Sequence, residues 1–233
     1  MIYAAVLAGG SGLRMGGELP KQFLRVGGRP IIIRSIDAFY ESGLTDEIYV
    51  AVSADYVDYT KNLIAEFCPE VTAHVIIGGK NRNETLYNVL KKIEADGMAD
   101  DDIILTHDAV RPFINTRIIS DNIEAVKQYG ACNTVVPAVD TMVHSADGSF
   151  IDGIPSRSEL FHGQTPQSFN ARELLSLYET MTEDEFEIYT DACSVFIKNN
   201  KKVRLVTGDR NNIKLTYPED MEKAEIIIRE RNK

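Results

Sequence analysis

Short apolar runs rich in β-branched side chains recur along the chain and predict β-strands. The runs are Ile2–Leu7, Ile48–Val52, His74–Ile77, Ile103–Thr106, Thr134–Val139 and Val203–Val206. Several of them are apolar at nearly every position instead of alternating with polar residues. Strands of this kind are typical of a parallel sheet that is covered by helices on both faces.

Between these runs, apolar residues recur with helical spacing. The clearest sets are Leu86, Val89, Leu90 and Ile93, and then Ile119, Ile123 and Val126. Asn115 and Pro218 stand where signals for the start of a helix are expected. The alternation predicts an α/β fold, a doubly wound three-layer sandwich with a mostly parallel sheet. A length of 233 residues favours one domain over residues 1–233.

One stretch interrupts this alternation, at about residues 141–154. It has two short strand-like segments on either side of the pair Asp147-Gly148, a pattern that predicts a projecting β-hairpin arm. From these residues alone, a surface hairpin and an arm that packs on a second subunit are equally good interpretations.

Charge and composition exclude several classes of protein. The formal net charge is −10, which argues against a general nucleic-acid-binding surface because such surfaces cluster Lys and Arg. No apolar stretch approaches the ~20 residues of a membrane span, and no signal peptide is recognised, so we expect a cytoplasmic protein. Cys68, Cys132 and Cys193 form no CxxC pair, and we expect reduced core thiols.

The first predicted strand runs directly into a glycine-rich loop, Leu7–Gly16, which is followed by Pro20–Phe23. Glycines after a strand let backbone N–H groups approach phosphate oxygens. The loop is not a dinucleotide fingerprint, because Met15 stands where that pattern needs its third glycine. Two cations, Arg14 and Lys21, flank the loop. Such cations suit a triphosphate in phosphoryl or nucleotidyl transfer, where negative charge develops.

The fourth strand leads into Thr106–Pro112, which brings an acid, an imidazole and a cation to the carboxyl end of a strand. Ligands of open α/β sheets bind at that edge. Asp108 suits Mg²⁺ that bridges phosphates. An Asx turn or an ion pair with Arg111 is the alternative for Asp108. We interpret His107 as structural, because a phosphate nucleophile is already ionised and needs no general base.

Weaker motifs lie elsewhere in the chain. In the segment Gly78–Thr85, the glycines and Thr85 suit recognition of a base edge, although a turn followed by a helix explains them equally. Further polar positions are Arg157, the segments 164–167 and 190–192, and Lys214 within 212–216. Alone, each is a weak signal.

Taken in order, the segments LAGGSGLRMG, PKQF, GGKNRNET, THDAVRPF, DT, GQTPQSF, TDA and NIKLT resemble one family across essentially the whole chain. This family is the cytidylyltransferases that transfer CMP from CTP to polyol phosphates. The resemblance implies an in-line attack of the acceptor phosphate on the α-phosphorus of CTP, which gives a CDP-polyol and pyrophosphate. It also implies a homodimer that exchanges the arm.

The resemblance assigns roles to individual residues. Those that would act on the triphosphate and the transition state are Arg14, Lys21 and Lys214. Those that would surround the cytidine are Ala8, Gly9, Gly10, Gly79 and Thr85. Those that would face the acceptor phosphate are Asp108, Arg111, Thr141, Arg157 and Thr190, with Asp108 also positioning Mg²⁺.

Two branches of the family differ in acceptor. Val110, Phe113 and the segment Gly163–Phe169 resemble the ribitol-5-phosphate branch more than the 2-C-methyl-D-erythritol 4-phosphate branch of isoprenoid synthesis. We therefore expect D-ribitol 5-phosphate, with the second acceptor as the alternative. Two other classes of protein are alternatives. A nucleotide-binding regulatory protein would be expected to have lost a transition-state cation, but Arg14, Lys21 and Lys214 are all present. A nicotinamide oxidoreductase would need a regular GxGxxG motif, which the loop after the first strand does not have.

Overall fold

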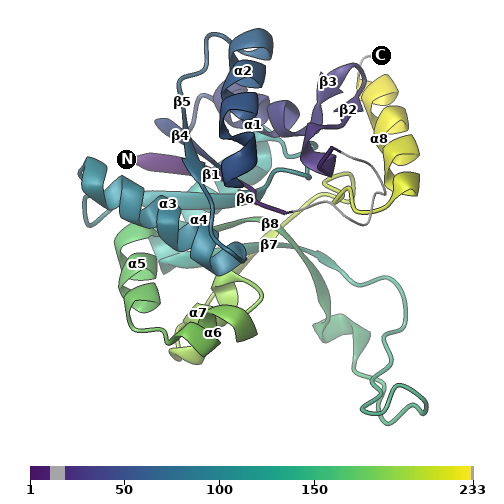
Figure 1. Ribbon diagram of the computed structural model, residues 1–233. Coiled ribbons are helices and arrows are strands. Elements are labelled where there is room, and N and C mark those ends of the chain that lie inside the picture. Colours follow the sequence, from purple (N-terminus) through teal and green to yellow (C-terminus); the bar gives the residue numbers. More distant parts are fainter. Residues whose placement is uncertain (11–18, 232–233) are drawn as a thin grey trace.

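The computed structural model describes residues 1–10 and 19–231. Its centre is a seven-stranded sheet in the order β5-β4-β1-β6-β8-β7-β9 (Figure 1). The strands are β1 (Ile2–Ala8), β4 (Glu47–Val52), β5 (Ala73–Ile77), β6 (Ile103–Asp108), β7 (Ala131–Pro137), β8 (Phe161–Asn170) and β9 (Arg204–Thr207). Within this sheet only β8 runs against its neighbours β6 and β7. The predicted doubly wound sandwich with a mostly parallel sheet is confirmed.

Helices cover both faces of the sheet (Figure 1). On one face lie α1 (Ile31–Ser42), α2 (Val57–Phe67) and α4 (Thr116–Tyr129). On the other lie α3 (Arg82–Asp96), α5 (Ala171–Glu179), α6 (Glu183–Ile188) and α7 (Ala192–Lys198). In the described part of the chain, the short 3₁₀ segments are η2 (Lys21–Phe23), η3 (Ala54–Tyr56) and η4 (Arg157–Glu159).

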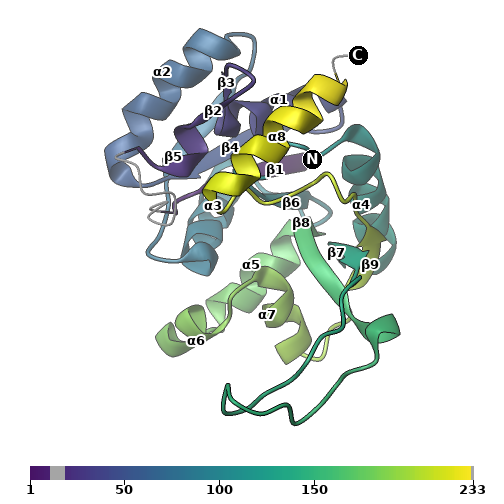
Figure 2. The ribbon, with the colours of Figure 1, turned by 90° about the vertical axis from the view of Figure 1, so that its right-hand side faces the viewer.

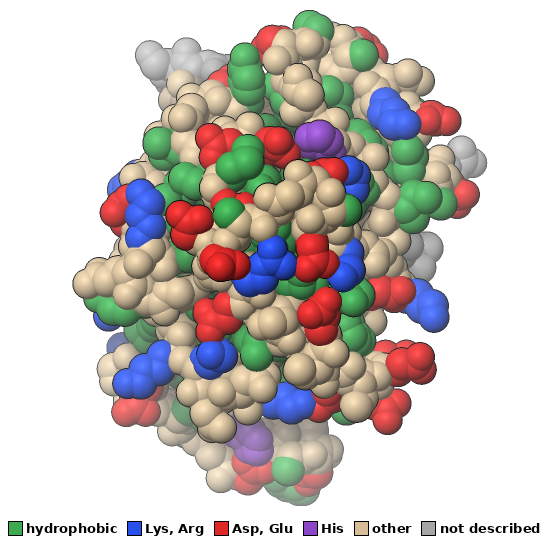
Figure 3. Space-filling view, turned by 90° about the vertical axis from the view of Figure 1, so that its left-hand side faces the viewer, with side chains coloured by type: hydrophobic (Ala, Val, Ile, Leu, Met, Phe, Trp, Pro, Cys, Tyr) green, Lys and Arg blue, Asp and Glu red, His purple; other side chains and the backbone are tan. Residues whose placement is uncertain are grey.

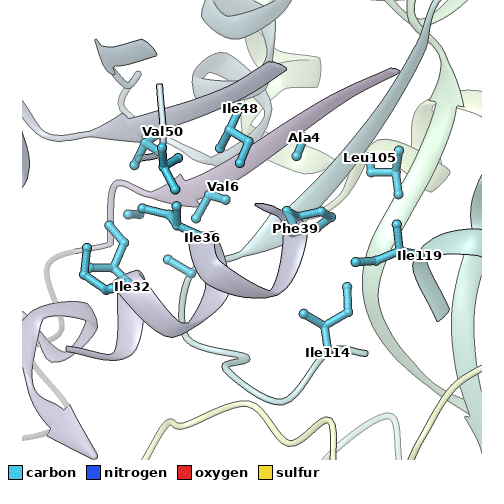
Figure 4. Close-up of a cluster of buried hydrophobic side chains, with 14 of the residues drawn as sticks. Ala4, Val6, Ile32, Ile36, Phe39, Ile48, Val50, Leu105, Ile114 and Ile119 are labelled. Atoms are coloured by element: carbon cyan, nitrogen blue, oxygen red, sulfur yellow. The ribbon is translucent and has the colours of Figure 1, made fainter. Parts of the chain in front are cut away.

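Two hydrophobic clusters explain why the strands are apolar at successive positions. Side chains of a strand alternate between the two faces of the sheet. In β1, Ala4 and Val6 pack against Phe39 of α1, whereas Tyr3 and Ala5 pack in the cluster of α3 and α5. Figure 4 shows the first cluster, in which α1 lies against β1 and β4. A strand buried on both faces cannot show a polar alternation.

A third cluster attaches the C-terminal helix α8 (Pro218–Arg231) to the hairpin of β2 (Arg25–Val26) and β3 (Arg29–Pro30). Figure 2 shows α8 beside this hairpin. Its core includes Val26, Phe113 and Ile228. The backbone N–H of Leu215 also donates to the carbonyl of Val110, at 2.9 Å. The cluster therefore holds the segment that carries Lys214 beside the end of β6.

The helix starts that the sequence predicts at Asn115 and Pro218 are found in the structure. Asn115 caps α4, because its side-chain oxygen accepts from the N–H of Ile118. Helix α8 begins at Pro218. The three cysteines are buried and free, as predicted. Among the described helices, none has the length and the apolar character that crossing a membrane requires.

Strand β8 is absent from the strands that the apolar pattern predicts. Its central residues, Gln164, Thr165, Gln167 and Ser168, are buried but polar. Several of their polar groups are matched by neighbours: the Thr106 hydroxyl donates to the backbone carbonyl of Gln167, and the Ser168 hydroxyl donates to Asn122. The side-chain oxygen of Gln167, by contrast, is buried without a partner among the described residues. Because the buried side chains of this strand are polar and several are held by hydrogen bonds, the strand leaves no apolar pattern in the sequence.

The predicted arm projects from the sandwich (Figures 1 and 2). The Ala138 N–H donates to the Leu160 carbonyl at its base, and Gly148 takes a positive φ of 70° in the predicted turn. Its pairing is reduced to one antiparallel bridge, between His144 and Gly153, so the two predicted strands are extended loop instead. Backbone N–H groups near the turn donate to the carboxylates of Asp147 and Asp152 instead of to the facing strand.

Candidate active site

A cavity of about 490 Å³ opens where β1 and β6 end at their carboxyl edge. Its walls come from the end of β1, η2, the first turn of α3, the end of β6 and the segment before α8. Parallel strands place their carboxyl ends side by side, and ligands of open α/β sheets bind there. Residues that are distant in sequence therefore share one site.

Backbone segments form one wall of this cavity and are held by side-chain hydrogen bonds. The Gln22 amide donates to the carbonyls of Ala8 and Gly10, at 2.7 and 3.0 Å. The Thr85 hydroxyl accepts from the Gly79 N–H at 2.9 Å and donates to the Asn81 carbonyl at 2.7 Å. Both loops are thus fixed before a ligand arrives. The Thr85 hydroxyl is thus engaged within the protein both as a donor and as an acceptor.

A cluster of one carboxylate and three cations forms another part of the site. Asp108 lies 2.8 Å from Nζ of Lys214, 3.4 Å from Nε of Arg82 and 4.0 Å from Nε of Arg111. Burial alone would raise the pKa of Asp108, but Arg82, Lys214 and Arg111 hold it well below its usual value. Asp108 is therefore ionised at neutral pH, and the cluster retains an excess of positive charge.

This positive site lies in an acidic protein. The face in Figure 3 shows acidic and basic side chains interspersed, without one dominant basic area. In the cavity, by contrast, Lys21 is buried with 8% of its surface exposed and stands in the same lining as Arg82 and Lys214. A concentration of cations in a hollow attracts a compact anion.

His107 precedes Asp108 but does not belong to the cavity lining. It is fully buried, and both ring nitrogens are engaged: Nδ1 with the Thr165 hydroxyl at 2.9 Å and Nε2 with the Arg111 carbonyl at 3.0 Å. Burial lowers the pKa of His107 to about 4. This arrangement agrees with a structural role.

The structure brings most of the predicted site residues together. Those that line the cavity are Ala8, Gly9, Gly10, Lys21, Gly79, Thr85, Asp108 and Lys214. Arg111 lies just behind this lining, where it faces Asp108 and donates to the carbonyls of Asn212 and Gly163. Arg14 lies outside the described residues.

Three predicted residues are not in the lining of this cavity. Thr141 and Arg157 lie in the segment of the arm between its base residues Ala138 and Leu160, where Arg157 donates to the Val139 carbonyl at 3.2 Å. Thr190 lies between α6 and α7. Its neighbour Tyr189 accepts a hydrogen bond from the Asn83 amide, which ties that loop to the first turn of α3.

The structure adds lining residues to which no binding role is assigned from the sequence: Leu7, Gln22, Lys80, Asn81, Arg82 and Val110. Arg82 is the most informative of them, because its ion pair with Asp108 joins residues 26 positions apart. Its signal in the sequence is its position at the start of a helix that follows a glycine pair. That signal alone does not reveal its partner.

The described residues do not fit a magnesium ion held by side chains. Both oxygens of Asp108 face cations, and the described residues contain no group of three Asp, Glu, His or Cys side chains able to hold a metal. A protein-bound magnesium ion needs free carboxylate oxygens. The predicted role of Asp108 as a metal ligand is therefore not supported by this arrangement.

Comparison with known proteins places this cavity in a family. The family model for 2-C-methyl-D-erythritol 4-phosphate cytidylyltransferase matches residues 2–230. The chain belongs to this cytidylyltransferase family. It is accordingly an enzyme, a CTP-dependent cytidylyltransferase, as the resemblance in its motifs predicts.

Solved structures of cytidylyltransferases share the fold over nearly the whole chain. A 4-diphosphocytidyl-2C-methyl-D-erythritol synthase from Anaerococcus prevotii is 28% identical, with a TM-score of 0.82 and 98% of each chain covered. The 2-C-methyl-D-erythritol 4-phosphate cytidylyltransferase of Francisella tularensis is 25% identical, with a TM-score of 0.81 and coverage of 97% of this chain and 98% of that one. The 2-C-methyl-D-erythritol 4-phosphate cytidylyltransferase of Thermus thermophilus, at 24% identity, a TM-score of 0.75 and 98% coverage of each chain, supports the fold alone.

Proposed function

We propose that this cytidylyltransferase transfers CMP from CTP to 2-C-methyl-D-erythritol 4-phosphate and releases pyrophosphate. The observation that carries the proposal is the cavity in which Lys21, Arg82 and Lys214 gather around a glycine-lined loop. The family model, named for this acceptor, matches residues 2–230.

In the proposed reaction, an oxygen of the acceptor phosphate attacks the α-phosphorus of CTP. One P–O bond forms, the bond between the α-phosphorus and the bridging oxygen breaks, and pyrophosphate leaves with the electron pair. Lys21 and Lys214 would stabilise the charge that develops on the phosphoryl oxygens. No general base is required, because the attacking phosphate is already ionised, and His107 is neutral and occupied by its own hydrogen bonds.

Arg14 belongs to the same proposal as a second cation of the glycine-rich loop. Magnesium enters it only as the counter-ion that CTP phosphates carry, and no step above uses its chemistry. The close backbone of Gly9, Gly10 and Gly79 favours a pyrimidine over the larger purine. Ala8 and Thr85 would complete the cytidine site.

The choice of acceptor departs from the expectation of D-ribitol 5-phosphate. Of the positions behind that expectation, Val110 lines the cavity. Phe113 packs in the hydrophobic cluster below α8, and Gln164 to Phe169 are buried in β8. Residues that do not face the cavity carry little information on its ligand. The ribitol ester therefore remains the second candidate, supported by Val110 alone.

One assay separates the two acceptors. The protein is incubated with CTP, Mg²⁺ and either 2-C-methyl-D-erythritol 4-phosphate or D-ribitol 5-phosphate, and pyrophosphate release is measured. We expect kcat/KM for the erythritol ester to exceed that for the ribitol ester by about 10² or more, as a site that fits one acceptor should discriminate. The reverse ratio would replace the proposed acceptor, and ATP in place of CTP is the nucleotide control.

The arm is part of the same proposal, as the element of a homodimer that completes the acceptor site. Thr141 and Arg157, which the resemblance assigns to that site, lie on the arm and outside the lining of this chain's own cavity. The arm also exposes Phe150, Ile151 and Ile154, with 62 to 78% of their surfaces accessible. Exposed apolar groups of this kind suit a contact between subunits.

Mixing two inactive variants tests whether the arm acts on a partner. Lys21→Ala removes a cation of the body, and Arg157→Ala alters the arm. In a mixed dimer with exchanged arms, one of the two sites has both residues intact, so co-refolding should restore about a quarter of the sites. Complete inactivity of the mixture would mean that the arm serves its own chain. Sedimentation of each variant checks that dimers form.

A further inference from the structure

Arg82, the first residue of α3, has an unusual set of partners. Its Nε faces Oδ1 of Asp108 at 3.4 Å, whereas Nη1 and Nη2 are buried and have no hydrogen-bond partner among the described residues. The side chain lines the cavity beside Asp108 and Lys214. Two terminal donor groups of a charged side chain are thus left without an acceptor in the part of the chain that the structure describes.

Such donors are costly. A buried N–H group without a partner destabilises a fold by about 1–3 kcal/mol, and more when it is charged. An arginine present only for stability would have its terminal nitrogens paired, as Arg29 and Arg172 have: both donate from terminal nitrogens to a carboxylate and to a backbone carbonyl. The unpaired state of Arg82 indicates an acceptor that comes from outside the chain.

We propose that Arg82 binds a substrate phosphate through its two terminal NH₂ groups. A guanidinium is planar and offers paired donors that match two oxygens of one phosphate. Asp108 contacts the guanidinium at Nε, so the buried Nη1 and Nη2 groups are the donors that remain for a ligand. Arg82 then acts as a substrate-binding residue that adds specificity to the cations of the site.

The charges around Arg82 favour an anion over a neutral ligand. Asp108 neutralises one of the three cations that face it, Arg82, Arg111 and Lys214. Nε of Arg111 is also buried without a hydrogen-bond partner in the described part of the chain. An incoming phosphate would supply both the missing negative charge and the missing acceptor oxygens.

This inference rests on the proposed function, in which two phosphates meet in the cavity. The α-phosphate of CTP and the phosphate of the acceptor have the same chemistry, and either one can occupy this position. The N–H of Lys80 and the cap residue Asn81 are engaged with Glu84. The first turn of α3 therefore presents Arg82 from a backbone that is already fixed.

Arg82→Lys is the decisive variant. Lysine keeps a positive charge next to Asp108 but does not offer two parallel donors at the outer edge. Binding is measured by calorimetry with two probes, CTP alone and then inorganic phosphate added to the CTP complex. We expect the affinity for one of them to fall by about tenfold or more, and kcat/KM by about 10². The probe that is affected identifies the phosphate.

Thermal unfolding separates this role from a structural one. The ligand-free midpoint of Arg82→Lys should equal or exceed that of the wild type, because unpaired buried donors are removed, while the rise in midpoint on adding CTP and phosphate should shrink. Arg172→Lys is the matched control, since Arg172 pairs with Glu94 and the Met98 carbonyl outside the cavity. It should lower the ligand-free midpoint and leave kcat/KM unchanged.

Wild-type affinity for both probes in Arg82→Lys would overturn the inference. So would a loss of binding that merely follows a loss of ligand-free stability. These binding experiments do not require an acceptor to be known. Failure of the proposed reaction with every polyol phosphate is therefore distinguishable from failure of the role of Arg82.

Discussion

The hydroxyl of Thr165 donates a hydrogen bond to Nδ1 of His107, at 2.9 Å in a fully buried position. The same hydroxyl oxygen accepts from the Asp108 N–H, while the hydroxyl proton of Thr165 points to the imidazole. Nε2 faces the Arg111 carbonyl, which can only accept. The ring is therefore the neutral tautomer with its proton on Nε2, and it ties β8 to the end of β6.

This bond network predicts a pH dependence of stability. Burial lowers the pKa of His107 from 6.5 to about 4, so the unfolded chain binds a proton in this range that the folded chain does not. The stabilisation is complete above pH 6.5 and is lost as the pH falls towards 4, by about 3 kcal/mol. His107→Gln, measured by urea unfolding from pH 7.5 to 4.5, should be less stable at pH 7.5 and show a flatter profile.

Carboxylates also titrate in this range, and the difference between the two profiles isolates His107. Identical slopes for the wild type and His107→Gln would show that His107 does not cause the loss. Because the imidazole lies outside the cavity lining, kcat at pH 7.5 should change far less than for a variant of a lining cation.

A second prediction concerns the two lysines of the cavity. Lys21→Ala should lower kcat by about 10² or more and weaken CTP binding much less, because its charge acts on the transition state. Lys214→Ala should do the same and also release the carboxylate of Asp108 from its 2.8 Å contact. Steady-state kinetics with calorimetric CTP affinity measure the two effects. Unchanged turnover in either variant removes that lysine from the mechanism.

Lys223→Ala is the matched control for these variants. Lys223 also lies near a carboxylate, Asp220, at 3.8 Å, but it is exposed on α8. Exposed ion pairs contribute about 0–1 kcal/mol, so both stability and turnover should remain close to wild type.

The sheet and its site edge were predictable from the sequence because burial on both faces leaves a direct pattern. Every position of β6 is buried, and its apolar run points to Asp108 at its carboxyl end. Strand β8 was not predictable, because Gln164, Thr165 and Ser168 are polar and their hydrogen-bond partners come from other elements. A hydrophobic pattern does not record such pairing.

The site, like the sheet, was predictable in part. Glycine loops and lysines indicate a phosphate site in the local sequence, and the fold brings Lys21 and Lys214 into one cavity. The pairing of Arg82 with Asp108 depends on how α3 packs beside β6, which no local pattern specifies. The same limit applies to the metal: Asp108 suits Mg²⁺ by residue type, but its neighbours in space are cations.

A third prediction uses two glycines that line the cavity in different ways. A Cβ at Gly79 would lie 2.8 Å from the backbone carbon of Glu84, whereas a Cβ at Gly10 would meet no described residue within 4 Å. Gly79→Ala should therefore shift the start of α3 and lower both ligand-free stability and CTP affinity. Gly10→Ala should keep wild-type stability and lose affinity only where a ligand approaches that backbone.

Thermal unfolding in the absence of ligand measures the stability of each variant, and titration with CTP measures its affinity. Equal stability losses in the two variants would contradict the packing described here. Wild-type CTP affinity in Gly10→Ala would show that the nucleotide does not come close to Gly10.

The last prediction concerns Asn83, which couples the two halves of the proposed site. Its buried side chain donates from the amide to the Tyr189 carbonyl, and its oxygen accepts from the Tyr178 hydroxyl at 3.0 Å. The loop that it holds carries Thr190, the proposed contact for the acceptor phosphate. Asn83→Asp keeps the acceptor for Tyr178 but places a carboxylate oxygen against the Tyr189 carbonyl, which repels it.

We expect Asn83→Asp to raise KM for the acceptor by about tenfold and to change KM for CTP by less than about threefold, since Gly79 and Thr85 remain in place. Tyr178→Phe is the control, because it removes one hydrogen bond and leaves the Asn83 amide on Tyr189. It should lower stability by about 1 kcal/mol with little effect on either KM. Parallel changes in both KM values for Asn83→Asp would mean that the loop with Thr190 does not serve the acceptor alone.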